Sequence, residues 1–169
     1  KIMQWAGFFY MESGKLRKAE SLLRKGLKAD EECPFCHEYL GEVALIRGDY
    51  RKAIEYLEEA VRRDEYGDKA KVKLATALVH EGDYRRAEEL YERAFELNPK
   101  NDETLYRLCE VYLTRGKLDD AESILRRNKA GRTSGWISLA QAEILKHKVT
   151  CPPPLYRTTS RQRHYRRTV

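Results

Sequence analysis

Four glycines recur at intervals of 34 residues, and this period constrains the fold more than any other feature of the chain. They are Gly14, Gly48, Gly82 and Gly116. An alanine follows each glycine by five residues, at positions 19, 53, 87 and 121. Self-similarity at a fixed period of about 20–50 residues is the signature of a repeat architecture, in which each unit stacks on its neighbours.

Small and large apolar residues recur in the same phase around each glycine. The small residues, seven positions before it, are Gly7, Gly41, Ala75 and Cys109. The large residues, nine positions after it, are Leu23, Leu57, Tyr91 and Leu125. Small residues let two helices approach closely, and large ones fill the space beside them. We expect Cys109 to be a core packing residue. Asp49 and Asp83 follow turn glycines, where their carboxylates could cap the next helix. Each unit is therefore predicted to be a helix, a tight turn and a second helix.

The period, the small-residue positions, the turn glycines and the run Glu96-Leu-Asn-Pro99 resemble the tetratricopeptide repeat family. The resemblance covers four units, at approximately residues 1–33, 34–67, 68–101 and 102–133. It implies an all-α, right-handed superhelical solenoid of helix-turn-helix repeats. Residues 134–149 carry an apolar stripe without a fifth turn glycine, so we expect one more helix that caps the last repeat. The prediction is nine helices and no β-sheet.

The positive charge is concentrated near the end of the chain. Residues 150–169 contain five Arg and no acid, although the whole chain has a net charge of +6. The rest of the chain is nearly neutral, which argues against a continuous basic face for nucleic acid. We expect this Pro- and Arg-rich tail to be mobile and to carry any polyanion contact. No run approaches the roughly 18 apolar residues of a membrane span, so no membrane partner is expected.

The run Cys33-Pro-Phe-Cys36-His37 leaves three interpretations open. C-x-x-C-H is the signature of covalent c-type haem attachment, with the histidine as an axial ligand, and would indicate an electron-transfer protein in the periplasm or outside the cell. A redox disulfide between Cys33 and Cys36 is the second interpretation. The third is that the cysteines lie at the start of a helix without a chemical role, in a chain that could be cytoplasmic. No second haem ligand is evident, so we expect no cofactor. Zinc shared with His147 and Cys151 is not expected, because the two pairs belong to opposite ends of a solenoid.

The sequence lacks the common signatures of catalysis. It contains no G-x-S-x-G elbow, phosphate-binding loop or H-E-x-x-H motif, so we expect no enzymatic activity. The resemblance implies instead a groove that binds an extended peptide, lined by the first helix of each unit. The candidates at the matching positions are Phe8, Glu38, Tyr39, Glu42, Val72, Lys73, Thr76, Tyr106, Arg107 and Glu110. Tyr39 and Tyr106 are expected either to anchor a partner or to pack between repeats.

The partner itself is constrained by charge. Some members of the family hold the acidic C-terminus of a chaperone with a clamp of Lys and Asn side chains. If the clamp is placed on units one to three, only Lys69 and Lys73 resemble it. If it is placed on units two to four, Glu38, Glu42 and Glu103 occupy clamp positions. We therefore expect a scaffold for another protein or peptide, and not for an acidic chaperone tail. A structural subunit that self-associates through its solenoid ends is a further alternative.

Overall fold

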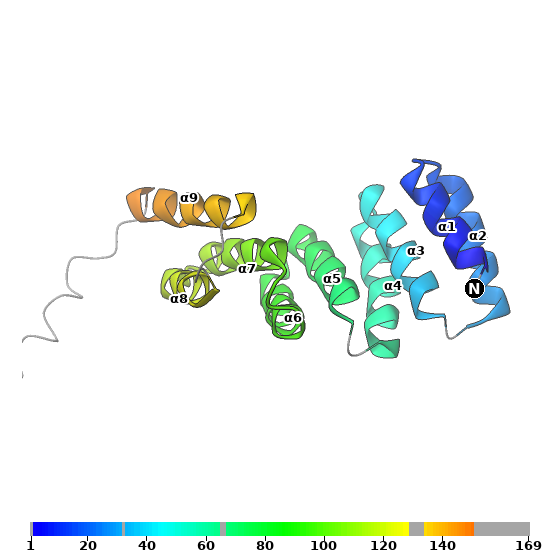
Figure 1. The fold of residues 1–169 in the computed structure, drawn as a ribbon. Coiled ribbons are helices and arrows are strands. Elements are labelled where there is room, and N and C mark those ends of the chain that lie inside the picture. Colours follow the sequence, from blue (N-terminus) through cyan, green and yellow to red (C-terminus); the bar gives the residue numbers. More distant parts are fainter. Residues whose placement is uncertain (1, 32, 65–66, 129–133, 151–169) are drawn as a thin grey trace, which may run out of the picture.

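The computed structural model describes residues 2–31, 33–64, 67–128 and 134–150, which form nine α-helices and no strand (Figure 1). The helices are α1 Ile2–Glu12, α2 Leu16–Ala29, α3 Pro34–Ile46, α4 Tyr50–Arg63, α5 Asp68–Glu81, α6 Tyr84–Leu97, α7 Asp102–Thr114, α8 Leu118–Asn128 and α9 Gly135–Thr150. The predicted all-α repeat fold is confirmed over these ranges. The expectations for residues 151–169, including a mobile tail and its polyanion contact, fall outside the described residues.

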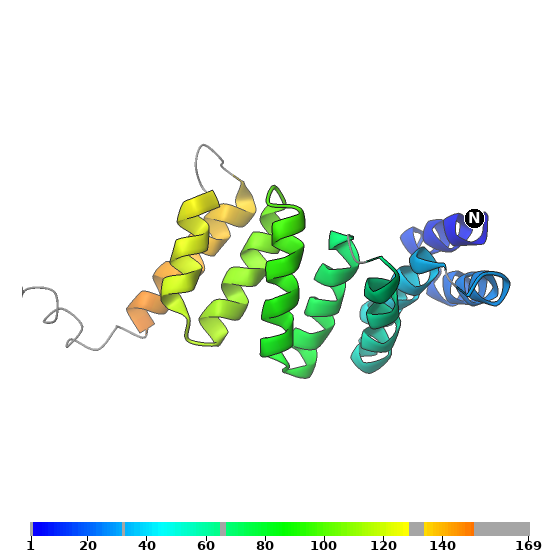
Figure 2. The same ribbon diagram turned by 90° about the horizontal axis from the view of Figure 1, so that it is seen from below.

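Successive helices pack as antiparallel pairs that stack into an elongated array (Figures 1 and 2). Each of the four predicted turns contains its glycine at positive φ, between 71° and 84°. This left-handed backbone region is costly for residues with a Cβ atom, which explains the recurrence of glycine. The predicted caps differ. Asp83 accepts a hydrogen bond from the Arg86 backbone N–H, whereas Asp49 leaves its helix uncapped and instead pairs with the Lys52 ammonium at 2.7 Å.

Close contact between the two helices of a unit explains the small-residue positions. A Cβ atom built on Gly41 would lie 2.5 Å from Cγ of Leu57, and one on Gly7 would lie 2.6 Å from Cγ of Leu23. Both leucines are fully buried. Such separations are far below van der Waals contact, so a larger residue at these places would force the α1–α2 and α3–α4 pairs to repack.

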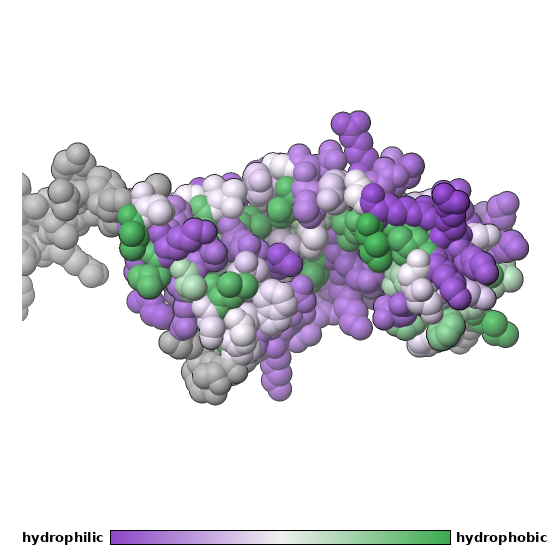
Figure 3. All heavy atoms as spheres, turned by 90° about the horizontal axis from the view of Figure 1, so that it is seen from above, coloured by the Kyte–Doolittle hydropathy of each residue, from purple (hydrophilic) through white to green (hydrophobic). Residues whose placement is uncertain are grey.

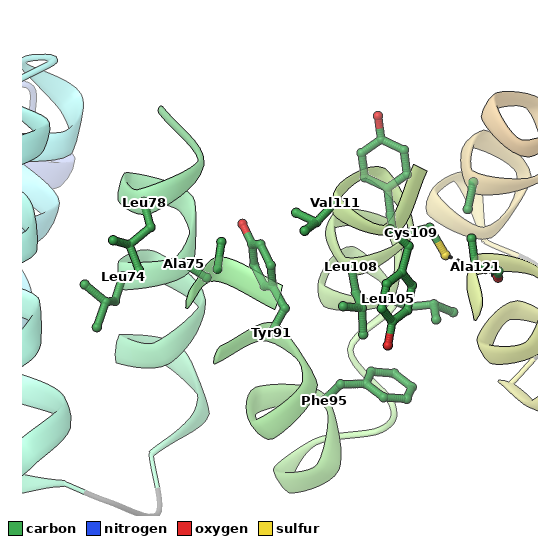
Figure 4. Close-up of a cluster of buried hydrophobic side chains, with 14 of the residues drawn as sticks. Leu74, Ala75, Leu78, Tyr91, Phe95, Leu105, Leu108, Cys109, Val111 and Ala121 are labelled. Atoms are coloured by element: carbon green, nitrogen blue, oxygen red, sulfur yellow. Dashed lines mark hydrogen bonds between the residues drawn. The ribbon is translucent and has the colours of Figure 1, made fainter. Parts of the chain in front are cut away.

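The same packing continues through the middle of the array. In Figure 4, side chains of α5 and α6 face those of α7 around the buried ring of Tyr91. Cys109 lies in this core, and burial raises the pKa of its thiol to about 12, as expected for a packing residue without a chemical role.

The final helix, α9, packs mainly on α7 and to a lesser extent on α8. It buries Ile137, Ala140 and Ile144 in the main core, and His147 Nε2 lies 3.3 Å from the Leu113 carbonyl oxygen. At the earlier repeat junctions, the incoming helix packs mainly on the second helix of the preceding unit. The array therefore ends with a helix laid along the first helix of the last unit (Figure 1). Among the described helices, none is both long and apolar enough to cross a membrane.

Candidate functional site

The ten predicted groove residues all lie on first helices, namely α1, α3, α5 and α7. Nine of them are half-buried, and Tyr106 is buried. A half-buried side chain is held by its neighbours and still has surface to offer, which suits the floor of a binding groove. Five of them, together with Glu103, form two charged clusters, and a pocket lies beside the second.

The first cluster, Glu38, Glu42 and Lys73, joins α3 to α5. The Lys73 ammonium lies 2.6 Å from a carboxylate oxygen of Glu38 and 2.6 Å from one of Glu42. Burial alone would lower the pKa of Lys73, but the two carboxylates outweigh it, so the pKa is raised and the side chain stays charged. Two negative charges against one positive charge leave this cluster with a net charge of −1.

Aromatic side chains border the first cluster. The rings of Phe8 and Tyr39 lie 5.3 Å apart, and the Lys73 ammonium lies 5.7 Å from the centre of the Tyr39 ring. Tyr39 therefore packs between repeats while remaining half-exposed. Burial, followed by the charge of Glu38, raises the pKa of its hydroxyl. The ring can serve both as a repeat contact and as a platform for a partner.

The second cluster, Glu103, Arg107 and Glu110, lies along α7. The Arg107 guanidinium is 3.2 Å from a carboxylate oxygen of Glu110 and 3.9 Å from one of Glu103. This cluster also carries a net charge of −1. The Tyr106 hydroxyl donates to Glu110 at 2.7 Å. Burial and this hydrogen bond raise the pKa of Tyr106 to about 12, so the hydroxyl remains a donor at physiological pH.

Of the two roles expected for Tyr106, anchoring a partner or packing between repeats, its burial agrees with packing. Tyr106 is only 8% exposed, because Trp136 of α9 lies over it with ring centres 5.4 Å apart. Trp136 is 39% exposed, and the Arg107 guanidinium lies 5.9 Å from its ring centre. At this place the exposed aromatic ring is therefore that of Trp136. The sequence predicted that Trp136 would lie on the apolar stripe of the last helix, but not that it would lie beside the groove residues.

A pocket of about 230 Å³ lies between α5, α6 and α7, next to the second cluster. Its lining consists of Thr76, Val79, His80, Tyr84, Tyr91, Arg107, Glu110, Val111 and Thr114. Thr76 donates to the Val72 carbonyl at 2.9 Å, so the Tyr91 hydroxyl, also at 2.9 Å, donates to Thr76. Small-molecule sites commonly have volumes of about 300–1,000 Å³, so this pocket better suits one or two side chains of a peptide.

The Cys33-Pro-Phe-Cys36-His37 run lies at the entry to α3. The sulfur atoms of Cys33 and Cys36 are paired as a disulfide, and both residues are buried. His37 Nδ1 lies 3.0 Å from the Cys33 carbonyl oxygen. Within the part of the chain that the structure describes, no three His, Cys, Asp or Glu side chains gather as a metal site.

The absence of haem remains a prediction, and it can be tested directly. Thioether bonds to haem would need the same two sulfur atoms that the disulfide joins. We expect the chain, co-expressed with a haem-attachment system, to keep the mass of its polypeptide and to show no Soret absorption band. A haem mass increment that disappears in a Cys33→Ser, Cys36→Ser variant would overturn this prediction.

The packing of helix pairs around turn glycines defines a helical-repeat protein. Two family models described as the tetratricopeptide repeat match residues 10–68 and 78–128, which together make up more than half of the chain. The chain belongs to the tetratricopeptide repeat family. A search among curated proteins finds no match.

Several solved structures are similar to this chain. The first TPR domain of Spaghetti (RPAP3), solved with the HSP90 peptide SRMEEVD, is 23% identical with a TM-score of 0.66, over 68% of this chain and 91% of that one. MamA is 24% identical with a TM-score of 0.71, over 85% and 88%. PilF of Pseudomonas aeruginosa is 20% identical with a TM-score of 0.76, over 88% and 68%. At these identities the likeness shows a common fold.

Proposed function

We propose that this chain is a non-catalytic scaffold that binds an extended segment of another protein along the groove residues of α1, α3, α5 and α7. The observation that carries the proposal is the row of nine half-buried groove residues, which combine aromatic rings with charges. Aromatic anchors among polar groups are typical of peptide-binding surfaces. An elongated repeat array also offers a longer surface than a compact domain of equal size.

The charge of the two clusters supports a partner segment that contains basic side chains. Each cluster has two carboxylates and one cation, so each has a net charge of −1. Lys73 is the groove residue that could hold a carboxylate in a clamp, and it is engaged by Glu38 and Glu42. An acidic tail would have to compete with these carboxylates and would be repelled by them. RPAP3 was solved with an acidic peptide, but its likeness to this chain concerns the fold.

The pocket between α5, α6 and α7 can hold one side chain of the bound segment and so fix its register. Val79 and Val111 provide apolar wall that suits the aliphatic stem of a lysine or arginine side chain. The Glu110 carboxylate, which also pairs with Arg107, lines the same pocket and would share its charge with the head of that side chain. A single anchored side chain fixes the register of an extended peptide, and the neighbouring clusters then select its charge.

Binding to a peptide library would test this function. We expect peptides with several Lys or Arg residues and an aromatic residue to bind more tightly than acidic peptides of the same length. Fluorescence anisotropy would measure the affinities, and a Val79→Lys variant, with helicity checked by circular dichroism, should weaken binding, because it fills the pocket and repels a basic side chain. Tighter binding of the acidic peptides, or no dependence on position 79, would contradict the proposed groove.

A second candidate function, self-association through the solenoid ends, is favoured by apolar side chains at both ends. On α1, Ile2, Trp5 and Phe9 form one stripe, and each is well over half exposed. On α9, Leu145 and Val149 are also largely exposed. Figure 3 shows hydrophobic residues at the end formed by α1 and α2 and at the end formed by α9. Removing such surfaces from water favours association of chains end to end.

Light scattering at increasing concentration would test this second function. The wild-type mass should rise above that of one chain, whereas a Trp5→Glu, Phe9→Glu variant should remain at one chain, because charges on the stripe oppose its burial. Ile46→Glu, which alters an exposed apolar residue away from both ends, is the matched control and should behave as wild type. A wild-type mass that stays at one chain throughout would exclude this function.

A further inference from the structure

The Cys33–Cys36 pair lies outside the proposed groove residues and has features that favour redox chemistry. The two sulfur atoms form a disulfide across two intervening residues, with Cα atoms 5.3 Å apart. That separation lies within the ordinary range for disulfides. Cys33 is the N-cap residue of α3, and Pro34 is its first helical residue. The pair therefore sits at the positive end of a helix dipole.

The local backbone is arranged to stabilise a thiolate at Cys33. The backbone N–H of Cys36 points to the Cys33 sulfur, with nitrogen and sulfur 3.3 Å apart. The first turn of α3 contains no acidic residue that would oppose a negative charge there. After reduction, the Cys33 thiolate would keep this hydrogen bond and the favourable field of the helix, and both stabilise a negatively charged sulfur.

The sulfur atoms are buried but border an open hollow. This hollow, about 360 Å³, is lined by Cys33 and Cys36 together with Ile2, Met3, Gln4, Gly26, Ala29 and Asp30. Glycine at position 26 leaves room beside the Cys36 sulfur, because a Cβ atom there would lie 3.1 Å from that sulfur. A small thiol can therefore reach the pair without separation of the first two repeats.

We propose that Cys33 and Cys36 are a redox-active dithiol–disulfide site that exchanges electrons with small dithiols or with exposed protein dithiols. A thiolate of the incoming dithiol attacks the Cys33 sulfur, the less buried of the two, and the S–S bond breaks to release Cys36 as a thiolate. The second thiolate of the dithiol then attacks its own sulfur in the mixed disulfide. This step releases the Cys33 thiolate, which the Cys36 N–H stabilises. Two electrons pass to the protein and the dithiol becomes a disulfide, while one of the two protons lost by the dithiol goes to the Cys36 thiolate and the other to solvent.

Alkylation with iodoacetamide and peptide mapping would test this proposal on the folded chain. After oxidation with glutathione disulfide, we expect Cys33 and Cys36 to resist labelling. Native treatment with dithiothreitol should add two labels at these positions while circular dichroism stays unchanged. Cys109 should remain unlabelled until the chain is unfolded, because it is buried in the core. Labelling of Cys33 and Cys36 after oxidation, or reduction only when Cys109 also becomes reactive, would overturn the proposal.

Variants that keep one cysteine of the pair distinguish a redox site from a merely structural bond. In Cys36→Ser, the remaining Cys33 should react with iodoacetamide near neutral pH about tenfold faster than Cys36 reacts in Cys33→Ser, since the helix stabilises only the Cys33 thiolate. Both variants should retain wild-type helicity. Equal rates in two folded variants would show that α3 does not activate Cys33, and the proposal would fail.

Discussion

Replacing Gly41 with alanine should destabilise the folded chain by about 1–3 kcal/mol, the usual scale for overpacking a core. The added Cβ atom would lie 2.5 Å from Cγ of Leu57 and 2.8 Å from its Cδ2. Leu57 is fully buried between α3 and α4, so it has little room to yield. In a helix, alanine is intrinsically favoured over glycine by up to about 1 kcal/mol, which makes a net loss a clear sign of steric conflict. Equilibrium unfolding in urea would measure the change.

Three further variants separate that steric conflict from a general effect of alanine. Gly135→Ala, in α9, introduces a Cβ with no atom within 4 Å, and should leave stability unchanged or slightly raise it. Leu57→Ala alone should cost about 2–5 kcal/mol, since it opens a cavity. The Gly41→Ala, Leu57→Ala double variant should be more stable than the sum of the single losses predicts, because the smaller side chain makes room for the new methyl group. Losses that add within about 0.5 kcal/mol would contradict close approach as the cause.

The helix pairs could be predicted from the sequence because a repeat is determined by local contacts. Gly41 and Leu57 belong to the same unit, and their equivalents Gly7 and Leu23 recur one period earlier. A small residue opposite a large one indicates the same close contact wherever it appears. The turn glycines are equally local, since positive φ at one position excludes most other residues.

The contacts that the sequence did not predict are those between one unit and the next. Trp136 covers Tyr106 because α9 lies along α7, and the four repeats contain no equivalent of that arrangement. The pairing of Lys73 with Glu38 and Glu42 spans about one repeat. Opposite charges on the first helices of adjacent units, 35 and 31 residues apart, were a usable signal for it. The C-x-x-C spacing left three interpretations of Cys33 and Cys36, and the fold brings their sulfur atoms together.

Replacing Glu38 and Glu42 with glutamine should weaken binding of a basic peptide by about 1–3 kcal/mol, the scale of an important interfacial group. The change converts the first cluster from a net charge of −1 to +1, because Lys73 loses both carboxylate partners. Glutamine oxygens can still accept hydrogen bonds from the Lys73 ammonium, so the helices should remain packed. The loss should be greatest at low ionic strength, where charges at a surface are least screened. Titration of labelled peptide at two salt concentrations would measure it.

A matched control carries the same change of charge elsewhere on the chain. Glu58 and Glu59 lie on α4, a second helix, and are paired with Arg86, Arg62 and Arg63 instead of with groove residues. Glu58→Gln with Glu59→Gln should leave the affinity for the basic peptide nearly unchanged, whereas the Glu38, Glu42 variant should lose affinity for it and gain affinity for an acidic peptide. Equal losses in both variants would mean that the overall charge of the chain governs binding. An acidic peptide that prefers the wild-type groove would contradict the charge argument itself, because Lys73 would then have to release two carboxylates to bind a third.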